Sequence, residues 1–443
     1  MRRRSAHIAA CLIGIFIPFS LAFPAVPSPM DALLEELTRK GVDLSDFDKP
    51  LPPSPANEYY QQGLLKLINN KLVEAAEEFK KALEKDPNHL PSIMALASIA
   101  LRQRDLKEAE RRCRQAIKVA PKDPRVHVAM SQIHMLQNRI ADAEKELRIA
   151  ADLGGGSIAP LMALGNLYSL QGRFEDALKE YQAAAAIRPD HPDPHLALGI
   201  TYARMGRLDE AMKEADRLAE LAPNSPIPYT FKGAIYAQQK RLEEAKKLFE
   251  KAIQIDYRFY PAHINLGNVY LELGDHDKAI EKYKEALSIQ PNSPRAHLML
   301  GHAYLLKGEK GLAEAEYREV LRLNPWDVIA LNNLAWIYAE EGRNLDEAVS
   351  LAEKAKKLAP KTPSVLDTLG WAYYKRGDID RALENILQAV KLGTNEADVY
   401  YHLGLVYMKK GMRGKAREAF RKALELNPKF DKADEIRRLL GGG

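Results

Sequence analysis

A period of 34 residues runs through most of the chain and limits its possible folds more than any other feature. The same residue types come into register when the units start at residues 56, 90, 124, 158, 192, 226, 260, 294, 328, 363 and 397, with one residue inserted between Arg343 and Asp346. The eighth position is always Gly, Ala or Ser, and the twentieth is alanine, displaced by one residue in the ninth unit. A repeat of this length predicts one continuous solenoid rather than several separate cores.

Each unit divides into two short amphipathic helices, as residues 260–291 illustrate. Pro261 suits a first helical turn, and Gly274 suits the left-handed conformation that ends a helix. In the second half, Ala279, Ile280 and Tyr283 recur at helical spacing opposite charged residues. One such pair cannot bury its own apolar stripe, so neighbouring pairs must stack on one another.

The repeated pattern L-G-x-x-Y, followed by Ala, an aromatic residue, Ala and Pro, resembles the tetratricopeptide repeat (TPR) family over about residues 56–430. The resemblance implies an all-α fold, a right-handed α-solenoid of about eleven 34-residue helix-turn-helix repeats. The apolar side of residues 431–443 predicts a C-terminal capping helix and tail. A bulky residue at Gly267 or Ala279 is expected to be destabilising, because small residues occupy the helix crossing.

The first three units differ from the others. Tyrosine holds the eleventh position in eight consecutive units from Tyr168 to Tyr407, whereas Lys66, Ala100 and His134 stand there first. We therefore expect divergent units at 56–157 and regular units at 158–430. Three glycines at 154–156 replace the expected turn and predict a flexible joint.

The first 22 residues have the build of a secretory signal peptide. Three arginines precede an apolar stretch over residues 8–23, and Ser20-Leu21-Ala22 is a suitable cleavage site. The alternative is an uncleaved inner-membrane anchor, although an apolar stretch interrupted by Pro18 is shorter than the roughly 20 residues that span a bilayer. Lipid attachment at Cys11 is disfavoured because the apolar stretch mostly follows that residue.

Residues 23–55 are predicted to be a proline-rich linker that contains a short amphipathic helix at 30–40. Leu33, Leu34 and Leu37 lie on one face of that helix. Two roles are open: the helix covers the outer edge of the first unit, or it docks on a partner. We favour the cover, because the exposed apolar stripe of the first unit needs covering.

Charge and motifs exclude several classes of function. The chain has 65 Lys and Arg against 60 Asp and Glu, a formal charge of +5 that falls to +2 (5 − 3) without the three N-terminal arginines. Nucleic-acid binding is therefore not expected. No catalytic motif, cofactor loop or cysteine pair is present, so we expect neither an enzyme nor a cofactor. His127, His195, His263 and His297 share the fourth position, but they lie on separate helices, so we expect no metal site.

The family resemblance implies that the first helices line a concave groove, with their second, fifth, sixth, ninth and twelfth positions facing it. This assignment gives a candidate partner-binding groove formed by Asn166, Asn265, Asn268, His302, Asn332, Asn333, Trp336, Asp367, Trp371 and Tyr374. Asparagines suit an extended peptide, because each amide both donates and accepts. Trp336 and Trp371 either carry binding energy or pack between neighbouring first helices.

Some members of this family bind a terminal carboxylate through Lys and Arg beside such asparagines. The corresponding positions here are Met299, Leu298 and Thr230, so we do not expect that activity.

Together these features predict an exported, periplasmic bacterial protein that binds protein or peptide segments as a scaffold or assembly factor of the cell envelope. The alternative is an adaptor subunit of a polysaccharide-export or protein-sorting complex that also contacts glycan through its aromatic residues. If residues 8–23 are not cleaved, the protein is anchored in the inner membrane and faces the periplasm.

Overall fold

The computed structural model of the chain describes residues 54–441. The predicted signal peptide, the helix predicted at 30–40 and all but the last two residues of the predicted linker lie outside the described residues. Within residues 54–441 the chain forms 23 helices and no strand. The contacts of the chain divide it into two larger parts, with the boundary between Asn224 and Ser225. They are called the first unit and the second unit, each contains several of the 34-residue repeats, and they are described separately.

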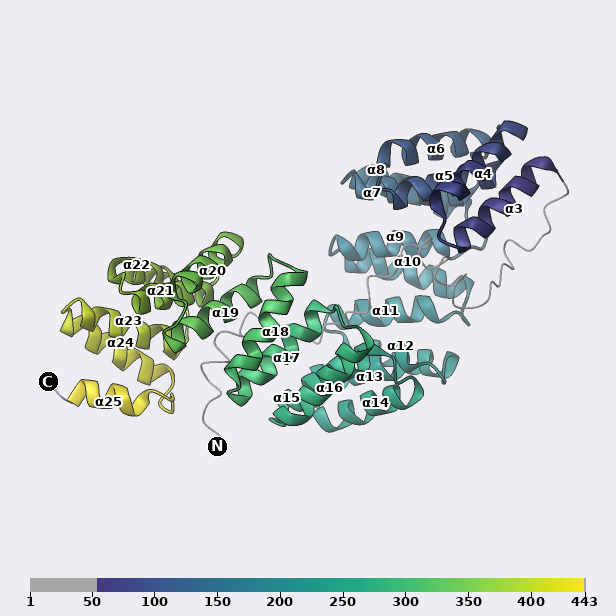
Figure 1. The fold of residues 1–443 in the computed structure, drawn as a ribbon. Coiled ribbons are helices and arrows are strands. Elements are labelled where there is room, and N and C mark those ends of the chain that lie inside the picture. The colour runs from purple at the N-terminus through teal and green to yellow at the C-terminus, as the bar shows by residue number, and fades with distance from the viewer. Residues whose placement is uncertain (1–53, 442–443) are drawn as a thin grey trace. The chain divides into compact units, whose positions relative to one another are not determined.

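The first unit, residues 54–224, contains five helix pairs. They are α3 (Pro55–Ile68), α4 (Leu72–Lys85), α5 (Leu90–Arg102), α6 (Leu106–Val119), α7 (Pro124–Leu136), α8 (Ile140–Leu153), α9 (Ala159–Leu170), α10 (Phe174–Ile187), α11 (Pro192–Arg204) and α12 (Leu208–Leu221) (Figure 1).

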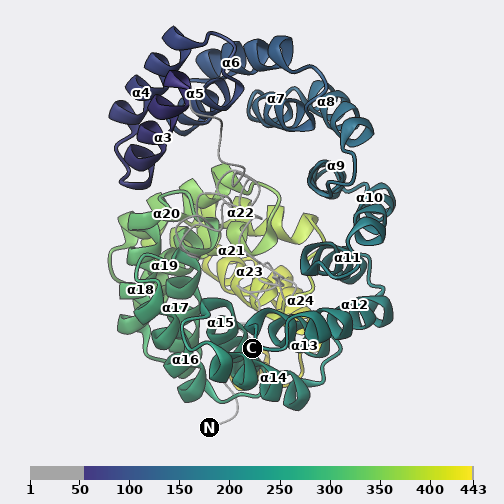
Figure 2. The same ribbon diagram turned by 90° about the vertical axis from the view of Figure 1, so that its right-hand side faces the viewer.

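The second unit, residues 225–441, contains six pairs and a final helix. They are α13 (Pro226–Gln238), α14 (Leu242–Ile255), α15 (Tyr260–Glu272), α16 (His276–Ile289), α17 (Pro294–Lys307), α18 (Lys310–Leu323), α19 (Val328–Glu341), α20 (Leu345–Leu358), α21 (Pro363–Arg376), α22 (Ile379–Lys391), α23 (Ala397–Lys409), α24 (Arg413–Leu426) and α25 (Ala433–Gly441). The succession of pairs can be followed from α15 to α20 in Figure 2. The predicted all-α solenoid of eleven helix pairs is confirmed.

Local signals set the ends of these helices. The side chain of Asp275 accepts a hydrogen bond of 3.2 Å from the backbone N–H of Lys278 and caps α16. Pro294 occupies the first turn of α17, where its missing N–H costs nothing. Gly308 ends α17 in the left-handed region, with a φ of 86°. These capping residues explain why the repeat register was readable from the sequence.

The small eighth position receives the side chain at the twenty-fourth position of the same pair. A Cβ added at Gly267 would lie only 2.5 Å from Cε1 of Tyr283. The same close approach joins Gly165 to the ring of Tyr181. Ala279, at the twentieth position, is completely buried. The small residues therefore allow an aromatic ring of the second helix to lie directly on the backbone of the first.

The tyrosines at the eleventh position connect successive pairs. Tyr338 donates a hydrogen bond of 2.9 Å to Glu314 on the preceding second helix. Tyr168 donates one of 3.1 Å to Glu144. This second bond crosses the glycine segment 154–156, so the pairs on either side of it keep the contact seen elsewhere. The flexible joint and the division at residue 157 stay predictions.

The outer edge of the first pair is mostly polar. The third and seventh positions of its first helix are Glu58 and Gln62, both exposed, whereas the equivalent Ala262 and Leu266 are buried. Leu65, at the tenth position, is the exception, because its side chain is 63% exposed whereas the later repeats bury the residue at that position. A polar outer face is what a terminal repeat requires. That residues 30–40 cover this edge stays a prediction.

The other end of the solenoid is covered by α25. Ala433 and Ile436 pack with Phe430 against Tyr401 and Phe420 of the last pair. Tyr401 also donates a hydrogen bond of 2.9 Å to Glu435. The final helix thus buries the apolar face that the eleventh pair would otherwise expose, as the sequence predicted. None of the helices in residues 54–441 has the length and apolar character needed to cross a membrane.

Candidate functional site

In each unit some first helices of successive pairs approach one another. In the first unit α7 contacts α9, and in the second unit α13 contacts α15, α19 contacts α21, and α21 contacts α23. Among residues 54–441 no two successive second helices make comparable contact. First helices that converge while second helices diverge lie on the inner side of the local curvature. This arrangement agrees with the helix layer that the family resemblance assigns to binding.

Nine of the ten predicted site residues lie in the second unit, on α15, α17, α19 and α21. We call the first-helix surface of residues 260–376 the polar face. Asn166 lies on α9 in the first unit and is not part of this face. Nine of the ten residues therefore lie on successive first helices of one unit.

The asparagines at the ninth position hold buried tyrosines. Tyr283 donates a hydrogen bond of 2.7 Å to Asn268 Oδ1, and Tyr181 donates one of 2.7 Å to Asn166 Oδ1. On α19, Asn333 donates through Nδ2 to the hydroxyl of Tyr317 at 3.2 Å. These three amides thus have a packing role that sequence reasoning missed. For Asn166 and Asn268, the polar pairing of positions nine and twenty-four within one repeat was the signal that could have shown this role, whereas Asn333 stands at the sixth position and bonds to the preceding repeat.

Both predicted tryptophans are buried, with 7% of Trp336 and 5% of Trp371 exposed. The Trp371 ring stacks on Tyr374 at 5.1 Å and on His402 at 4.1 Å, with ring planes within 16° of parallel. Its indole N–H donates a hydrogen bond of 2.7 Å to Glu340. The two indoles therefore pack in the layer of first helices, as the second of the two predicted alternatives states. A role in binding stays a prediction.

Asp367 also faces a neighbouring helix rather than solvent. Nδ1 of His402 lies 2.9 and 3.0 Å from the two carboxylate oxygens of Asp367, and both side chains are buried. Burial, together with the nearby Asp367 carboxylate, raises the pKa of Glu396 to about 7. Asp367 thus belongs to a buried ionisable group near the N-terminal ends of α21 and α23.

Buried polar atoms without hydrogen-bond partners are concentrated on the polar face. Among the described residues there are seven such atoms, and four belong to two helices of this face. They are Arg295 Nε, His302 Nε2, Asn332 Oδ1 and Asn333 Oδ1. Native proteins pair nearly all their buried polar groups, so this concentration needs an explanation.

Arg295 is the member of this group that sequence reasoning missed. It occupies the second position of its unit, one of the positions that the resemblance turns toward the groove, and should have been included. No ion pair joins it to any residue between 54 and 441. Burial lowers the pKa of its guanidinium, although the neighbouring Tyr260 and Tyr283 hydroxyl groups oppose the shift.

His302 shares this environment. Burial, with a smaller effect of the nearby His276, lowers the pKa of its imidazole to about 4. The ring is therefore neutral at neutral pH and can donate or accept one further hydrogen bond. Of the remaining predicted residues, Asn265 is buried on α15 and Tyr374 is half-buried on α21.

The histidines at the fourth position connect the helices of their own pair. In each of His127, His195, His263 and His297, Nδ1 lies 2.6–2.9 Å from a glutamate on the second helix, and Nε2 lies 2.7–3.2 Å from the carbonyl oxygen six residues earlier. Both ring nitrogens are thus engaged. No group of three or more potential metal ligands gathers in the described part of the chain.

Comparisons with known families agree with the geometry. Models described as TPR repeat or tetratricopeptide repeat match residues 66–133, 100–164, 165–206 and 193–225. A model described as the cilia and flagella-associated protein 70 C-terminal domain matches residues 221–439. The chain belongs to the tetratricopeptide repeat family.

Two solved structures and one curated protein are similar to parts of this TPR protein. It is similar to a chain in the crystal structure of the APC/C hetero-tetramer Cut9-Hcn1, with 17% identity and a TM-score of 0.51 over 92% of this chain and 98% of that one. At this identity the likeness shows the fold alone. A tetratricopeptide repeat protein from Parabacteroides merdae is 21% identical, with a TM-score of 0.44, over 56% of this chain and 97% of that one.

The curated relative is a TPR repeat-containing protein from Pseudomonas aeruginosa. It is 39% identical over 67 residues, which are 14% of this chain and 11% of the relative. The match therefore spans about one tenth of that protein's length. Membership of the TPR family supports a role as a protein-interaction scaffold, and nothing found here shows catalytic activity.

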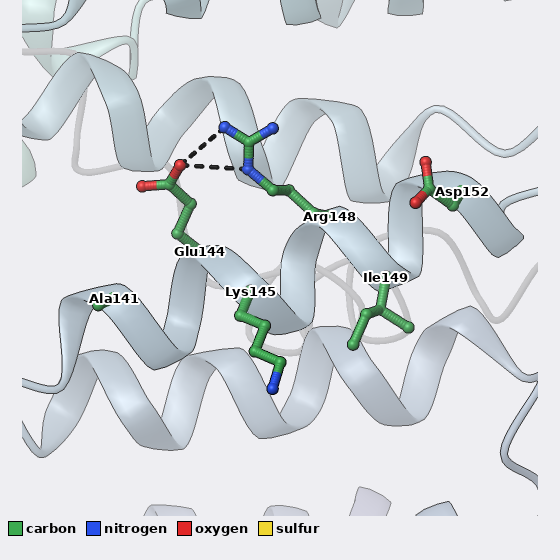
Figure 3. Close-up of a pocket in the computed structure, with 6 residues that line it drawn as sticks. All are labelled: Ala141, Glu144, Lys145, Arg148, Ile149 and Asp152. Atoms are coloured by element: carbon green, nitrogen blue, oxygen red, sulfur yellow. Dashed lines mark hydrogen bonds and ion pairs between the residues drawn. The ribbon is translucent and has the colours of Figure 1, made fainter.

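A shallow hollow on the TPR solenoid is lined by the residues of a single helix. It is lined by Ala141, Glu144, Lys145, Arg148, Ile149 and Asp152, all on α8. Figure 3 shows Glu144 paired with Arg148, while Lys145 and Ile149 point to the other side of the helix. Glu144 also accepts from Tyr168 and Arg173. The hollow is thus part of the contact between pairs.

Proposed function

We propose that this TPR protein is a scaffold that binds an extended segment of a partner protein along its polar face. The observation that carries the proposal is the group of buried, unpartnered polar atoms on α17 and α19. Leaving such an atom unpaired costs about 1–3 kcal/mol. A bound segment would recover part of this cost by supplying the missing partners.

The chemistry of the polar face suits a polypeptide backbone. An extended backbone alternates N–H donors with C=O acceptors. The guanidinium of Arg295 can only donate, the neutral ring of His302 can do either, and the Asn332 amide can do both. Met299 and Leu298, which are buried on the same helix, supply apolar surroundings that exclude water. Mixed polar and apolar surfaces of this kind are typical of protein interfaces.

The N-terminal sequence supports a site of action in the bacterial cell envelope. A signal peptide over residues 1–22 would deliver the TPR solenoid to the periplasm. Fractionation of cells that express the full chain, with protease added to intact spheroplasts, measures this directly. Protection from protease in spheroplasts would contradict the proposed location.

The glycan-binding alternative receives no support from a particular observation. Sugars stack on open aromatic faces, and the faces of Trp371 are covered by Tyr374 and His402. Trp336 is equally enclosed. We therefore do not propose that the protein binds glycan.

Affinity capture followed by peptide binding tests the proposed function. The mature chain would be used to recover partners from the envelope fraction, and overlapping peptides of each partner would then be titrated. The test variant combines Arg295→Met with Asn332→Leu. The matched control is Lys354→Met, which removes a cation from the exposed surface of α20. Circular dichroism verifies that all three proteins are folded.

We expect peptide affinity to fall at least tenfold in the test variant and to stay unchanged in the control. Equal affinity of the native chain and the test variant for every captured partner would show that the polar face is not the site.

A further inference from the structure

We propose that residues 30–40 of the chain dock on an apolar face made by the first helices α5, α7 and α9. This apolar face consists of Met94, Leu101, Met135, Leu136, Met162 and Leu170. The proposal concerns other helices than the polar face and does not rest on the function proposed above.

The apolar face lies at first-helix positions that carry polar or aromatic side chains in the second unit. Met94 and Met162 stand at the fifth position, where α19 and α21 have Asn332 and Asp367. The four side chains at the fifth and twelfth positions are half-buried, whereas Leu136 and Leu170 are 63% and 80% exposed. Unbranched methionine side chains adapt to different partners and are frequent on surfaces that bind apolar helices.

Charge on these helices is one-sided. The sequences of α5, α7 and α9 contain no aspartate or glutamate. Arg102 ends α5 and is exposed, and the following turn exposes Arg104 next to Asp105, which caps α6. An occupant of the apolar face should therefore combine an apolar side with acidic residues.

Residues 30–40, with the sequence MDALLEELTRK, have this composition. Leu33, Leu34 and Leu37 share one side of a helix. Asp31, Glu35 and Glu36 supply three carboxylates, and the two cations, Arg39 and Lys40, stand together at the end of the segment. A helix of 11 residues is about 16 Å long, enough to cross two first helices that are about 8–10 Å apart.

The connection is long enough for this contact. Residues 41–53 join the segment to Ser54, which caps the start of α3. Thirteen extended residues reach at most about 43–47 Å, several times the spacing of neighbouring helices. The other edge within reach, the outer side of α3, is mostly polar, with Glu58, Gln62 and Lys66 beside a single exposed leucine, Leu65.

Photo-crosslinking in the full chain tests the proposal. A photoreactive amino acid replaces Leu34 in one variant and Ala32, on the opposite side of the segment, in the matched control. After irradiation, the mass of the product shows whether the crosslink is within one chain, and peptide mapping locates it. We expect the Leu34 position to crosslink within the chain to peptides of α5, α7 or α9, at least fivefold more than the Ala32 position.

A second pair of variants tests the surface itself. Leu136→Glu and Leu170→Glu replace exposed side chains, so folding should be unaffected, and together they should reduce the Leu34 crosslink at least fivefold. Leu392→Glu, at a residue 45% exposed in the second unit, is the control and should leave the yield unchanged. Crosslinks to α3 and α4 alone, crosslinks between chains, equal yields from Leu34 and Ala32, or no crosslink would overturn the proposal.

Discussion

The hydroxyl group of Tyr283 donates a hydrogen bond of 2.7 Å to Asn268, fifteen residues earlier on the partner helix of the same pair. The pairing follows a rule within the chain. The 34-residue repeats with tyrosine at the twenty-fourth position have a polar residue at the ninth, namely Asn166, Asn268 or His302. The repeats with phenylalanine at the twenty-fourth position have an apolar residue at the ninth, namely Leu64, Ala234 or Leu405. At the ninth position, Asn166 and Asn268 therefore serve the buried tyrosine hydroxyl group of their own repeat.

Replacing Asn268 with leucine should destabilise the second unit. The buried Tyr283 hydroxyl would lose its acceptor, at a cost of about 1–3 kcal/mol. Urea unfolding followed by circular dichroism measures the loss, and hydrogen exchange of residues 260–290 locates it. The control is the double variant Asn268→Leu/Tyr283→Phe, which copies the pairing of Leu405 with Phe420 and should recover most of the stability. A double variant as unstable as Asn268→Leu would contradict this explanation.

Adding one methyl group at Gly267 should also be destabilising. Its Cβ would lie 2.5 Å from the Tyr283 ring, which has to shift, at a cost of about 1–3 kcal/mol. Gly311 is the matched control, because a Cβ there meets nothing within 4 Å. Gly311→Ala should be neutral or stabilising by up to about 1 kcal/mol. Thermal unfolding of the two variants measures the difference, and we expect the lower melting temperature for the Gly267 variant. Equal melting temperatures would refute the close contact.

The half-buried Glu396 should make the stability fall as pH rises. Its pKa is raised from 4.5 to about 7, so between these values the folded chain keeps a proton that the unfolded chain releases. The folded state then binds more protons, and its stability decreases with increasing pH through this window. Glu396→Gln should remove about 1–2 kcal/mol of this pH dependence, allowing for solvent screening.

Unfolding of the native chain and of Glu396→Gln at pH 4.5, 5.5 and 7 measures the effect. The free energy of unfolding of Glu396→Gln should increase relative to that of the native chain as pH rises. Glu418→Gln, at an exposed position on α24, is the control and should show no such trend. A constant difference between Glu396→Gln and the native chain would exclude the raised pKa.

His263→Phe should weaken the contact between α15 and its neighbours. Nε2 of His263 donates to the Tyr257 carbonyl at 2.7 Å, and Nδ1 lies 2.9 Å from Glu285. Phenylalanine keeps the ring but leaves the carbonyl without its donor, so we expect a loss of about 1–3 kcal/mol. The measurement is the urea midpoint, and an unchanged midpoint would show that the ring alone stabilises this position.

The helix layer that carries the candidate site was predictable, but the state of its side chains was not. Trp336 and Trp371 stand at equivalent positions of neighbouring units, which places them on the first-helix surface. Periodicity could not show that α19 and α21 lie close enough to bury both indoles. Arg295 could have been found by position alone, whereas its lack of an ion pair depends on every residue around it.

The sequence by itself determined the repeat length, the two helices of each unit, their ends and the covering helix at the C-terminus. These features follow from short-range causes: helical periodicity, capping residues, and small side chains where two adjacent helices cross. Only the tertiary structure decided that Asn268 serves Tyr283, that the indoles are buried, and that polar atoms on α17 and α19 remain unpaired. Those outcomes depend on distances between side chains on different helices, up to about one repeat apart in sequence, which no local pattern specifies.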